Sequence, residues 1–240
     1  MKFAFLSDIH GNATALEAVL NDIDKQNVDQ TIVLGDIAYR GPEPKRSIEL
    51  VQSLNTTVIK GNADEWIVRG VNQGEVPDQA LTLMNQERDW TVDKLEKADI
   101  DYLASLPTET TFQQDGVTFH AFHATPDSLF DVVLPDASDQ EIESTLMRAK
   151  DADIYLYAHI HKSYIRFING KTIINLGSVG LPFDGVTKAS YAIVEVTDGN
   201  IRTSIEKVSY DIQKTIDAYN NVDYTNKAMM TQIIKTAKNN

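Results

Sequence analysis

The sequence contains no cysteine, and this absence excludes several kinds of site. Disulfide bonds, zinc–thiolate centres and cysteine nucleophiles are all ruled out. Any bound metal must therefore be held by histidine, aspartate, glutamate or asparagine side chains. Such ligands suit hard or borderline divalent ions.

Positive charge is also scarce. Lysine and arginine together number 22, against 35 aspartates and glutamates, and the formal net charge is −13. Binding to nucleic acid or to anionic membranes depends on basic residues. We therefore expect neither nucleic acid nor a membrane among the partners, and we attribute the acidity to solubility. A local cationic centre remains compatible with a small phosphate-ester substrate.

Long apolar runs are missing as well. The apolar run at residues 1–6 is too short for the core of a signal peptide. No segment approaches the roughly 20 apolar residues of a membrane span. These absences predict a cytoplasmic protein. The chain of 240 residues has 42% hydrophobic residues, as ordinary globular proteins do, and fits one large domain or two small ones.

The first sixty residues alternate between strand and helix patterns. Buried strands are predicted at residues 2–6, 31–34 and 58–59, and helices at residues 13–26 and 45–54. This order indicates a parallel sheet built from right-handed crossovers.

The rest of the chain divides into a helical part and a β-rich part. Residues 62–106 lack strand character and predict a helical insertion. Further strands are predicted at residues 110–114, 117–123, 154–158, 164–168, 171–175, 190–196 and 200–207. Further helices are predicted at residues 139–149, 209–220 and 224–238, the last two forming a C-terminal helical segment over 209–238. Because no linker or repeat interrupts the pattern, we expect a single domain over residues 1–240 with two sheets.

Side chains able to bind a metal follow the ends of the predicted strands. They are two aspartates, one asparagine and four of the five histidines: Asp8, His10, Asp36, Asn62, His123, His159 and His161. Sites in open α/β sheets form outside the carboxyl ends of strands. Strand alternation would let Asp8 with His10, and His159 with His161, each present two ligands to one site. Two ions that share a carboxylate explain such a large set of ligands.

Each of these residues has a structural alternative when it is taken alone. Asp8 could cap the following helix, Asp36 or Asn62 could be a turn residue after glycine, and an isolated histidine is often a core residue. Their joint occurrence at strand ends favours metal binding. His120 lies three residues before His123, so alternation places it on the opposite face and predicts a structural role.

Six short motifs occur in order along the chain. They read Asp8-x-His10-Gly11-Asn12, Gly35-Asp36-x4-Gly41-Pro42, Gly61-Asn62-x-Asp64, His123-x-x-Pro126, His159-x-His161 and Asn175-x-Gly177-Ser178-Val179-Gly180. This set resembles that of the calcineurin-like metallophosphoesterases, over residues 3 to about 183, and looks most like their small bacterial phosphodiesterase branch. The resemblance implies an α/β fold, α+β by some schemes: a two-sheet β-sandwich flanked by helices.

The resemblance also implies roles for the ligands. One metal would be held by Asp8, His10, His161 and a bridging Asp36, and the other by Asp36, Asn62, His123 and His159. The two divalent ions, with Mn²⁺ favoured over Fe, Zn or Ni, would activate a bridging hydroxide for attack on phosphorus. Asp36, Asn62 and His123 would be the catalytic residues of a dinuclear phosphoesterase.

Four neighbouring positions need separate interpretation. Many family members have a leaving-group acid, histidine, where this chain has Ala63, so we expect good leaving groups or another acid. Arg40 matches the position of a phosphate-binding arginine in the serine/threonine phosphatases, and it is either that or a surface residue. Asn12 is either the N-cap of the first helix or a substrate contact. Asp64 is expected to cap or to support the site.

Three functions are compatible with these motifs. A metal-dependent phosphodiesterase or phosphomonoesterase is favoured, because an unused site has no reason to keep its ligands. The alternative is a non-catalytic metal-binding interaction scaffold on the same fold, which Ala63 supports. A nuclease acting on DNA ends is disfavoured by the lack of a basic stripe. No pattern in the sequence specifies an oligomeric state.

Overall fold

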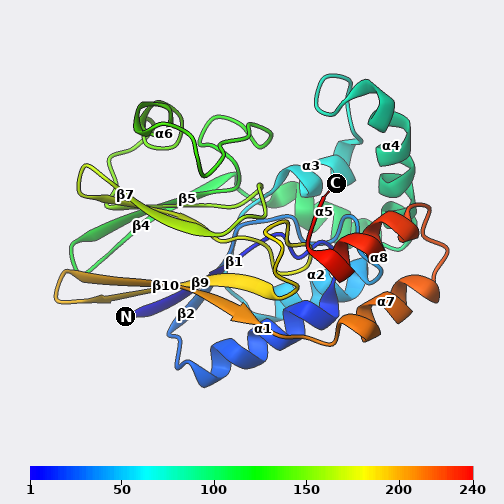
Figure 1. Ribbon diagram of the computed structural model, residues 1–240, viewed down its shortest axis with the longest axis horizontal. Coiled ribbons are helices and arrows are strands. Elements are labelled where there is room, and N and C mark those ends of the chain that lie inside the picture. Colours follow the sequence, from blue (N-terminus) through cyan, green and yellow to red (C-terminus); the bar gives the residue numbers. More distant parts are fainter. Residues whose placement is uncertain (240) are drawn as a thin grey trace.

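Two sheets packed face to face form the centre of the molecule, and helices flank them (Figure 1). The computed structural model describes residues 1–239. The first sheet has the strand order β10-β9-β1-β2-β3. Its strands are β1 (Lys2–Leu6), β2 (Gln30–Val33), β3 (Thr57–Val58), β9 (Ala189–Thr197) and β10 (Asn200–Val208). Strands β1, β2 and β3 run parallel, and the β9–β10 hairpin joins β1 in antiparallel fashion.

The second sheet has the order β4-β5-β6-β8-β7. Its strands are β4 (Glu109–Gln114), β5 (Val117–Phe122), β6 (Ile154–Tyr157), β7 (Tyr164–Ile168) and β8 (Lys171–Asn175). The central three strands run parallel, and β4 and β7 are antiparallel edge strands. The predicted two-sheet sandwich is therefore confirmed, with both sheets mixed.

Strand β1 shows why this sandwich forms. Its side chains alternate between two cores, as the two-residue period of a strand requires. Phe3 and Phe5 point into the core between the sheets, where their rings lie 5.4 and 6.1 Å from that of Phe119. Ala4 and Leu6 point to the opposite face, into the core beneath the helices. A strand buried on both faces needs a continuous apolar run, and residues 3–6 supply it.

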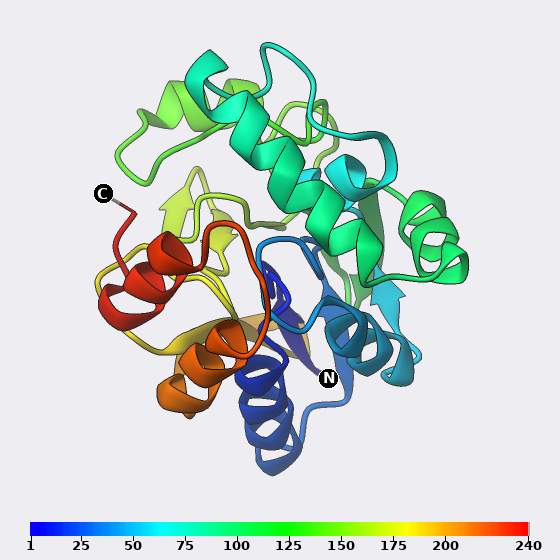
Figure 2. The ribbon, with the colours of Figure 1, turned by 90° about the vertical axis from the view of Figure 1, so that its right-hand side faces the viewer.

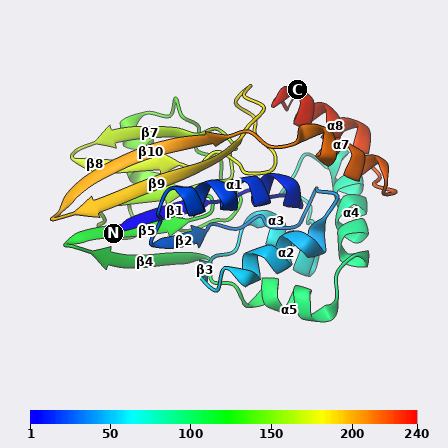
Figure 3. The same cartoon turned by 90° about the horizontal axis from the view of Figure 1, so that it is seen from below.

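Helices cover the outer faces and one end of the sandwich. They are α1 (Ala13–Lys25), α2 (Pro44–Ser53), α3 (Asn62–Arg69), α4 (Asp78–Asp93), α5 (Lys97–Ser105), α6 (Asp139–Thr145), α7 (Ile212–Asn220) and α8 (Lys227–Thr236). Helices α4, α7 and α8 lie at one end of the sandwich (Figure 3), and a view onto that end shows them around the strand ends (Figure 2). No helix among residues 1–239 is both long and apolar enough to cross a membrane.

Three predicted helix boundaries were wrong, and a specific contact accounts for each difference. Helix α6 ends at Thr145 instead of 149, because the Tyr155 hydroxyl group binds Lys150 O and Ala152 N and directs the chain into β6. Helix α7 begins at Ile212 because Asp211 caps it. Helix α8 begins at Lys227 because Tyr224, which was predicted to be helical, packs in the core beside α7.

Candidate metal centre

The predicted ligands lie just beyond the strands, in turns with left-handed backbone. Strand β1 ends at Leu6, and Asp8 and His10 follow with φ of 53° and 48°. Strand β6 ends at Tyr157, and His159 and His161 follow with φ of 66° and 56°. Strand alternation is therefore the wrong reason for their proximity. Paired left-handed residues turn both side chains inward, at a conformational cost of about 1–3 kcal/mol each.

Asp36 is held by a close approach of two turns. It also has a left-handed backbone, with φ of 56°. A Cβ atom at Gly61 would lie 2.1 Å from Asp36 Oδ1, so only glycine allows the two turns to meet here. Ala63 N donates to the same carboxylate oxygen at 2.8 Å. The other oxygen, Oδ2, is thereby directed toward the histidines.

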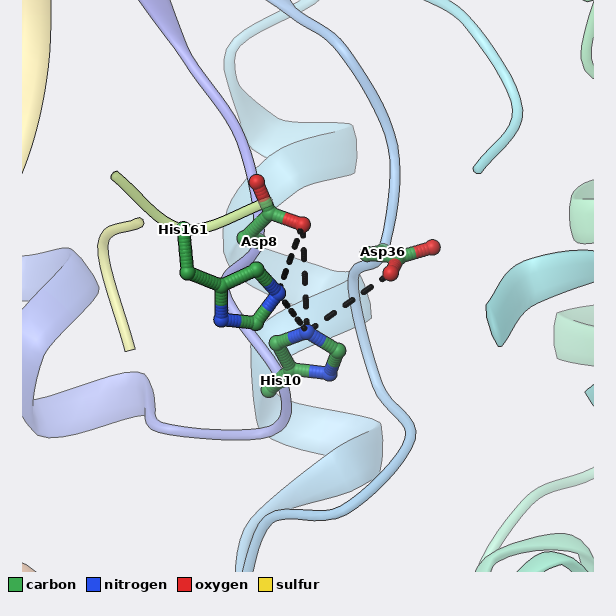
Figure 4. Close-up of side chains that lie close together, drawn as sticks. All are labelled: Asp8, His10, Asp36 and His161. Carbon is green, nitrogen blue, oxygen red and sulfur yellow. Dashed lines mark hydrogen bonds and ion pairs between the residues drawn. The ribbon is translucent and has the colours of Figure 1, made fainter. Parts of the chain in front are cut away.

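Four predicted ligands form one compact group, shown in Figure 4. Their ligand atoms all lie within 4.8 Å of one another, and all four residues are buried. His161 Nε2 is 3.2 Å from both Asp8 Oδ1 and His10 Nε2. Asp36 Oδ2 is 3.6 Å from His10 Nε2. This group can hold a metal ion, and it contains the set that the resemblance assigns to one metal.

The Asp8 carboxylate is the strongest sign that a cation belongs here. The side chain is fully buried, and neither oxygen makes a hydrogen bond. Burial raises the pKa of Asp8, but attraction by His161 and His123 outweighs burial, so the net pKa falls below its usual value. A buried carboxylate without donors is costly unless a positive charge lies beside it. A divalent cation among these ligands would satisfy both oxygens.

The histidines of this group are oriented as metal ligands. Nδ1 of His10 lies 2.9 Å from Tyr39 O, and Nδ1 of His161 lies 2.5 Å from Leu181 O. Because a carbonyl oxygen only accepts, Nδ1 of each ring carries a proton, and Nε2 of each ring is the nitrogen directed toward the ligand group. Burial lowers the pKa of His10 to about 4, so this imidazole is neutral at pH 7. The Nε2 lone pair of this neutral His10 ring is available to a cation bound in the group.

The remaining three predicted ligands converge on the other side of Asp36. Asn62 Oδ1 lies 2.9 Å from His123 Nε2 and 2.8 Å from His159 Nδ1. Asp36 Oδ2 lies 3.5 Å from His123 Nε2. His123 donates its Nδ1 proton to Leu34 O at 2.6 Å. All seven predicted ligands are therefore neighbours, and Asp36 Oδ2 lies between the two groups.

The two histidines of this second group differ in charge. Burial disfavours protonated His123, but attraction by Asp36 and Asp8 outweighs burial and raises its pKa to about 9. Burial, with repulsion from His123, lowers the pKa of His159 to about 4. In the metal-free protein a proton thus provides positive charge near Asn62 Oδ1 and Asp36 Oδ2, where a cation would otherwise do so.

Asp64 supports the site as expected. Its buried carboxylate accepts hydrogen bonds from Asp36 N at 2.7 Å, Gly61 N at 2.9 Å and Ile37 N at 2.9 Å. These bonds hold the turn that carries Asp36 against the start of α3. Burial and the charge of Asp36 raise the pKa of Asp64 to about 7.

Asn12 caps a helix, and the structure does not favour the alternative of a substrate contact. Its Oδ1 accepts from Ala15 N at 3.1 Å and from Thr215 Oγ1 at 3.0 Å. Its Nδ2 donates to Gly180 O at 3.1 Å, and the residue is 2% exposed. Because the amide is engaged on both ends inside the protein, we assign Asn12 to structure and withdraw the substrate role.

Arg40 lies at the site and is not a surface residue. It lines a cavity of about 150 Å³ above the ligands. The other residues that line this cavity are His10, Asp36, Tyr39, Asn62, Trp66, Met84, His159, His161, Leu181 and Phe183. Arg40 Nε donates to Glu87 Oε2 at 2.9 Å. Its position allows contact with a phosphate oxygen, and that role stays a prediction.

Sequence reasoning missed Glu87 and Phe183. Glu87 is fully buried on α4, in a segment that read only as part of a helical insertion. Phe183 stacks on His161 with ring centroids 4.3 Å apart. Its position just after the last motif was the only feature of the sequence that pointed to a role at the site. His120 lies on the opposite face, as predicted, with Nε2 2.6 Å from Glu109 Oε2.

Comparison with known proteins agrees with this geometry. Residues 1–199 match the calcineurin-like phosphoesterase superfamily domain. The uncharacterized protein MJ0912 of Methanocaldococcus jannaschii is 30% identical over 235 residues, covering 89% of this chain and 90% of that protein.

Solved structures show the same fold. A metallophosphoesterase from Sphaerobacter thermophilus superposes with a TM-score of 0.79 at 25% identity, covering 99% of both chains. The hypothetical protein PH1004 from Pyrococcus horikoshii superposes with a TM-score of 0.85 at 22% identity, covering 100% of this chain and 99% of the other. The fold, the match over residues 1–199 and the buried Asp/His group together show that this chain belongs to the calcineurin-like phosphoesterase superfamily.

Proposed function

We propose that this protein is a dinuclear metal-dependent phosphoesterase. The observation that carries the proposal is the position of Asp36 Oδ2, which lies 3.6 Å from His10 Nε2 and 3.5 Å from His123 Nε2. One carboxylate oxygen thus faces two groups of ligands, as expected of a carboxylate shared by two cations. Mn²⁺ is the favoured ion, with Fe, Zn or Ni as alternatives.

Bound divalent cations supply an activated water and neutralise charge that develops on phosphate. The protein has to hold and orient the groups around them. The Nδ1 bonds of His10, His123 and His161 to backbone carbonyls fix the three rings. The Arg40 guanidinium, anchored through Nε by Glu87, faces the cavity and would bind a phosphate oxygen.

The cavity offers little to protonate a leaving group. Apart from the predicted ligands, Tyr39 and Arg40 are its titratable lining residues. The Tyr39 hydroxyl already donates to Met84 O at 2.9 Å, and burial raises its pKa above the usual value. Ala63 is fully buried and does not line the cavity. These features support a substrate with a good leaving group.

The test combines metal analysis with turnover. The purified protein is loaded with Mn²⁺, Ni²⁺ or Zn²⁺, its metal content is measured by mass spectrometry, and hydrolysis of mono- and bis-(p-nitrophenyl) phosphate is followed. We expect two ions per chain and metal-dependent turnover. Two bound ions without turnover on either ester would favour the scaffold alternative instead.

Ala63→His tests how the leaving group departs. Ala63 itself stays outside the cavity lining, but it directly follows Asn62, which lines the cavity, so the longer histidine side chain is expected to reach the site. A well-placed general acid is worth about 10²–10⁴-fold. We therefore expect kcat for phenyl phosphate, which has a poor leaving group, to rise about tenfold or more relative to p-nitrophenyl phosphate. Since Ala63 packs in the core with Trp66, the larger side chain should also cost about 1–3 kcal/mol of stability.

Ala63→Gln is the matched control, because it adds similar bulk without an acid. It should lower stability in the same way and leave the preference between the two esters as in the wild type. An unchanged preference in Ala63→His as well would show that another group already supplies the proton.

The predictions about partners and location still depend on the sequence. We expect a small phosphate ester as the substrate and a cytoplasmic location. The predicted absence of nucleic-acid and membrane partners still depends on the net charge of −13.

A further inference from the structure

A second hollow adjoins the metal centre, next to the cavity that Arg40 lines. It is a groove of about 420 Å³, within the usual range of about 300–1,000 Å³ for small-molecule sites. Its lining residues are Val132, Leu134, His159, Ile160, Lys162, Phe183, Lys238 and Asn239. His159 and Phe183 also line the cavity beside Arg40. The predicted ligand His159 therefore has open space on two sides.

The apolar wall of this groove is built by anchored backbone. Tyr157 donates its hydroxyl proton to Val133 O at 2.8 Å, and the Val133 side chain is buried in the core beneath α6. Its two neighbours are turned outward as a result: Val132 is 59% exposed and Leu134 is 42% exposed. Because both side chains line the groove that His159 also lines, they give it an apolar wall beside a polar centre, as small-molecule sites have.

The partition between the two hollows is also held in place. Phe183 N donates to His161 O at 3.1 Å, and the Phe183 ring stacks on His161. A phosphate at the metal centre that carries two substituents has a separate hollow for each of them. A monoester has one substituent and can fill only one of the two hollows.

Positive charge lies at the rim of the groove. Lys162 and Lys238 are exposed and make no ion pair or side-chain hydrogen bond with residues 1–239. Many other basic residues of the chain, Arg46, Arg69 and Lys171 among them, pair with acidic groups. In a protein with a net charge of −13, two lysines left available beside the site favour an anionic ligand.

We propose that the substrate is a phosphodiester whose second substituent lies in this groove: an apolar or aromatic body against Val132 and Leu134, carrying an anionic group that reaches Lys162. The inference rests on the proposed phosphoesterase function. It names the substrate class of the same site. A diester is favoured over a monoester because only a diester fills both hollows.

Three synthetic esters with the same leaving group test the proposal. They are 4-nitrophenyl phosphate, phenyl 4-nitrophenyl phosphate and 4-carboxyphenyl 4-nitrophenyl phosphate. The second differs from the first by the aromatic substituent, and the third adds only a carboxylate. For the manganese-loaded wild type we expect kcat/KM to rise along this series, by about tenfold for the carboxylate.

Two groove variants separate the apolar and ionic contacts. Lys162→Gln should remove the preference for the carboxylated diester over the phenyl diester. Leu134→Ser should lower the ratio of kcat/KM for the phenyl diester to that for the monoester by about tenfold. Both residues are exposed, so the fold should tolerate both changes. Lys25→Gln, in the exposed last turn of α1, is the matched control and should leave every ratio as in the wild type.

The outcomes distinguish the groove from the function. Turnover of all three esters with ratios unchanged by Lys162→Gln and Leu134→Ser would overturn the groove assignment and leave the phosphoesterase intact. A monoester turned over faster than both diesters would overturn the substrate class. No turnover of any ester by the manganese-loaded wild type would overturn the proposed function itself.

Discussion

Asp36→Asn should remove bound metal and hydrolytic turnover together. Asparagine keeps the shape of the side chain, and its amide oxygen can still accept from Ala63 N. It lacks the negative charge that Oδ2 presents to both groups of ligands. Loss of an outer-shell partner of a metal ligand costs about 10–100-fold in affinity or activity, so loss of a shared ligand should cost more than about 100-fold. Metal content by mass spectrometry and kcat/KM on p-nitrophenyl phosphate measure the two effects.

His123→Ala provides the comparison for this variant. His123 faces only the second group, so its loss should mainly empty one position and leave about half of the metal. Thermal melts of the metal-free proteins check that both variants fold. Full metal occupancy in Asp36→Asn would show that this carboxylate does not join two ions.

Glu87→Ala should destabilise the protein by about 3–5 kcal/mol, the usual cost of leaving a buried charge without its partner. Glu87 is fully buried, whereas the side chain of Arg40 is 20% exposed. One Glu87 oxygen accepts from Arg40 Nε at 2.9 Å, and the other accepts from Asn226 Nδ2 at 2.8 Å. Removal of the carboxylate leaves the guanidinium group of Arg40 beside the cavity without its ionic partner. Urea unfolding of the metal-free protein measures the change in the free energy of unfolding.

Two further variants identify the cause of that loss. Glu87→Gln keeps the hydrogen-bonding shape without the charge and should cost less than Glu87→Ala. The double change of Glu87→Leu with Arg40→Met removes both charges and should also cost less, because no charge is left unpaired. If Glu87→Ala lay within about 0.5 kcal/mol of the wild type, Arg40 would not depend on Glu87.

The Arg40–Glu87 pair also connects the helical segment over residues 62–106 to the candidate metal centre. Helix α4 supplies Glu87, and Asn226 at the start of α8 binds the same carboxylate. Tyr219 on α7 donates its hydroxyl proton to Arg40 O. Two helical segments far apart in the chain thus meet at one arginine beside the candidate metal centre. Their effect on the site should appear in Glu87→Ala as a raised KM for phosphate esters.

Local patterns were sufficient to locate the strands, most helices and the predicted ligands. A strand such as Lys2–Leu6 is buried on both faces, and the resulting apolar run is visible in the chain itself. Polar residues that follow such runs gather at one edge because parallel strands all end there. The helix at 139–149 was overestimated because its helical periodicity does not report the contacts that Tyr155, at the start of the next strand, makes with Lys150 and Ala152.

The amino-acid sequence alone thus determined the two-sheet fold and which polar residues collect at its edge, because strand periodicity and strand ends are local properties. Only the tertiary structure decided how those residues are used. The amide of Asn12 is closed to a substrate because Thr215 and Gly180, more than 160 positions away in the chain, bind it. Packing also decides that neither oxygen of Asp8 has a hydrogen-bond donor. It likewise decides that Val132 and Leu134 are exposed. The surroundings of a side chain depend on which distant segments pack beside it, and no local pattern carries that information.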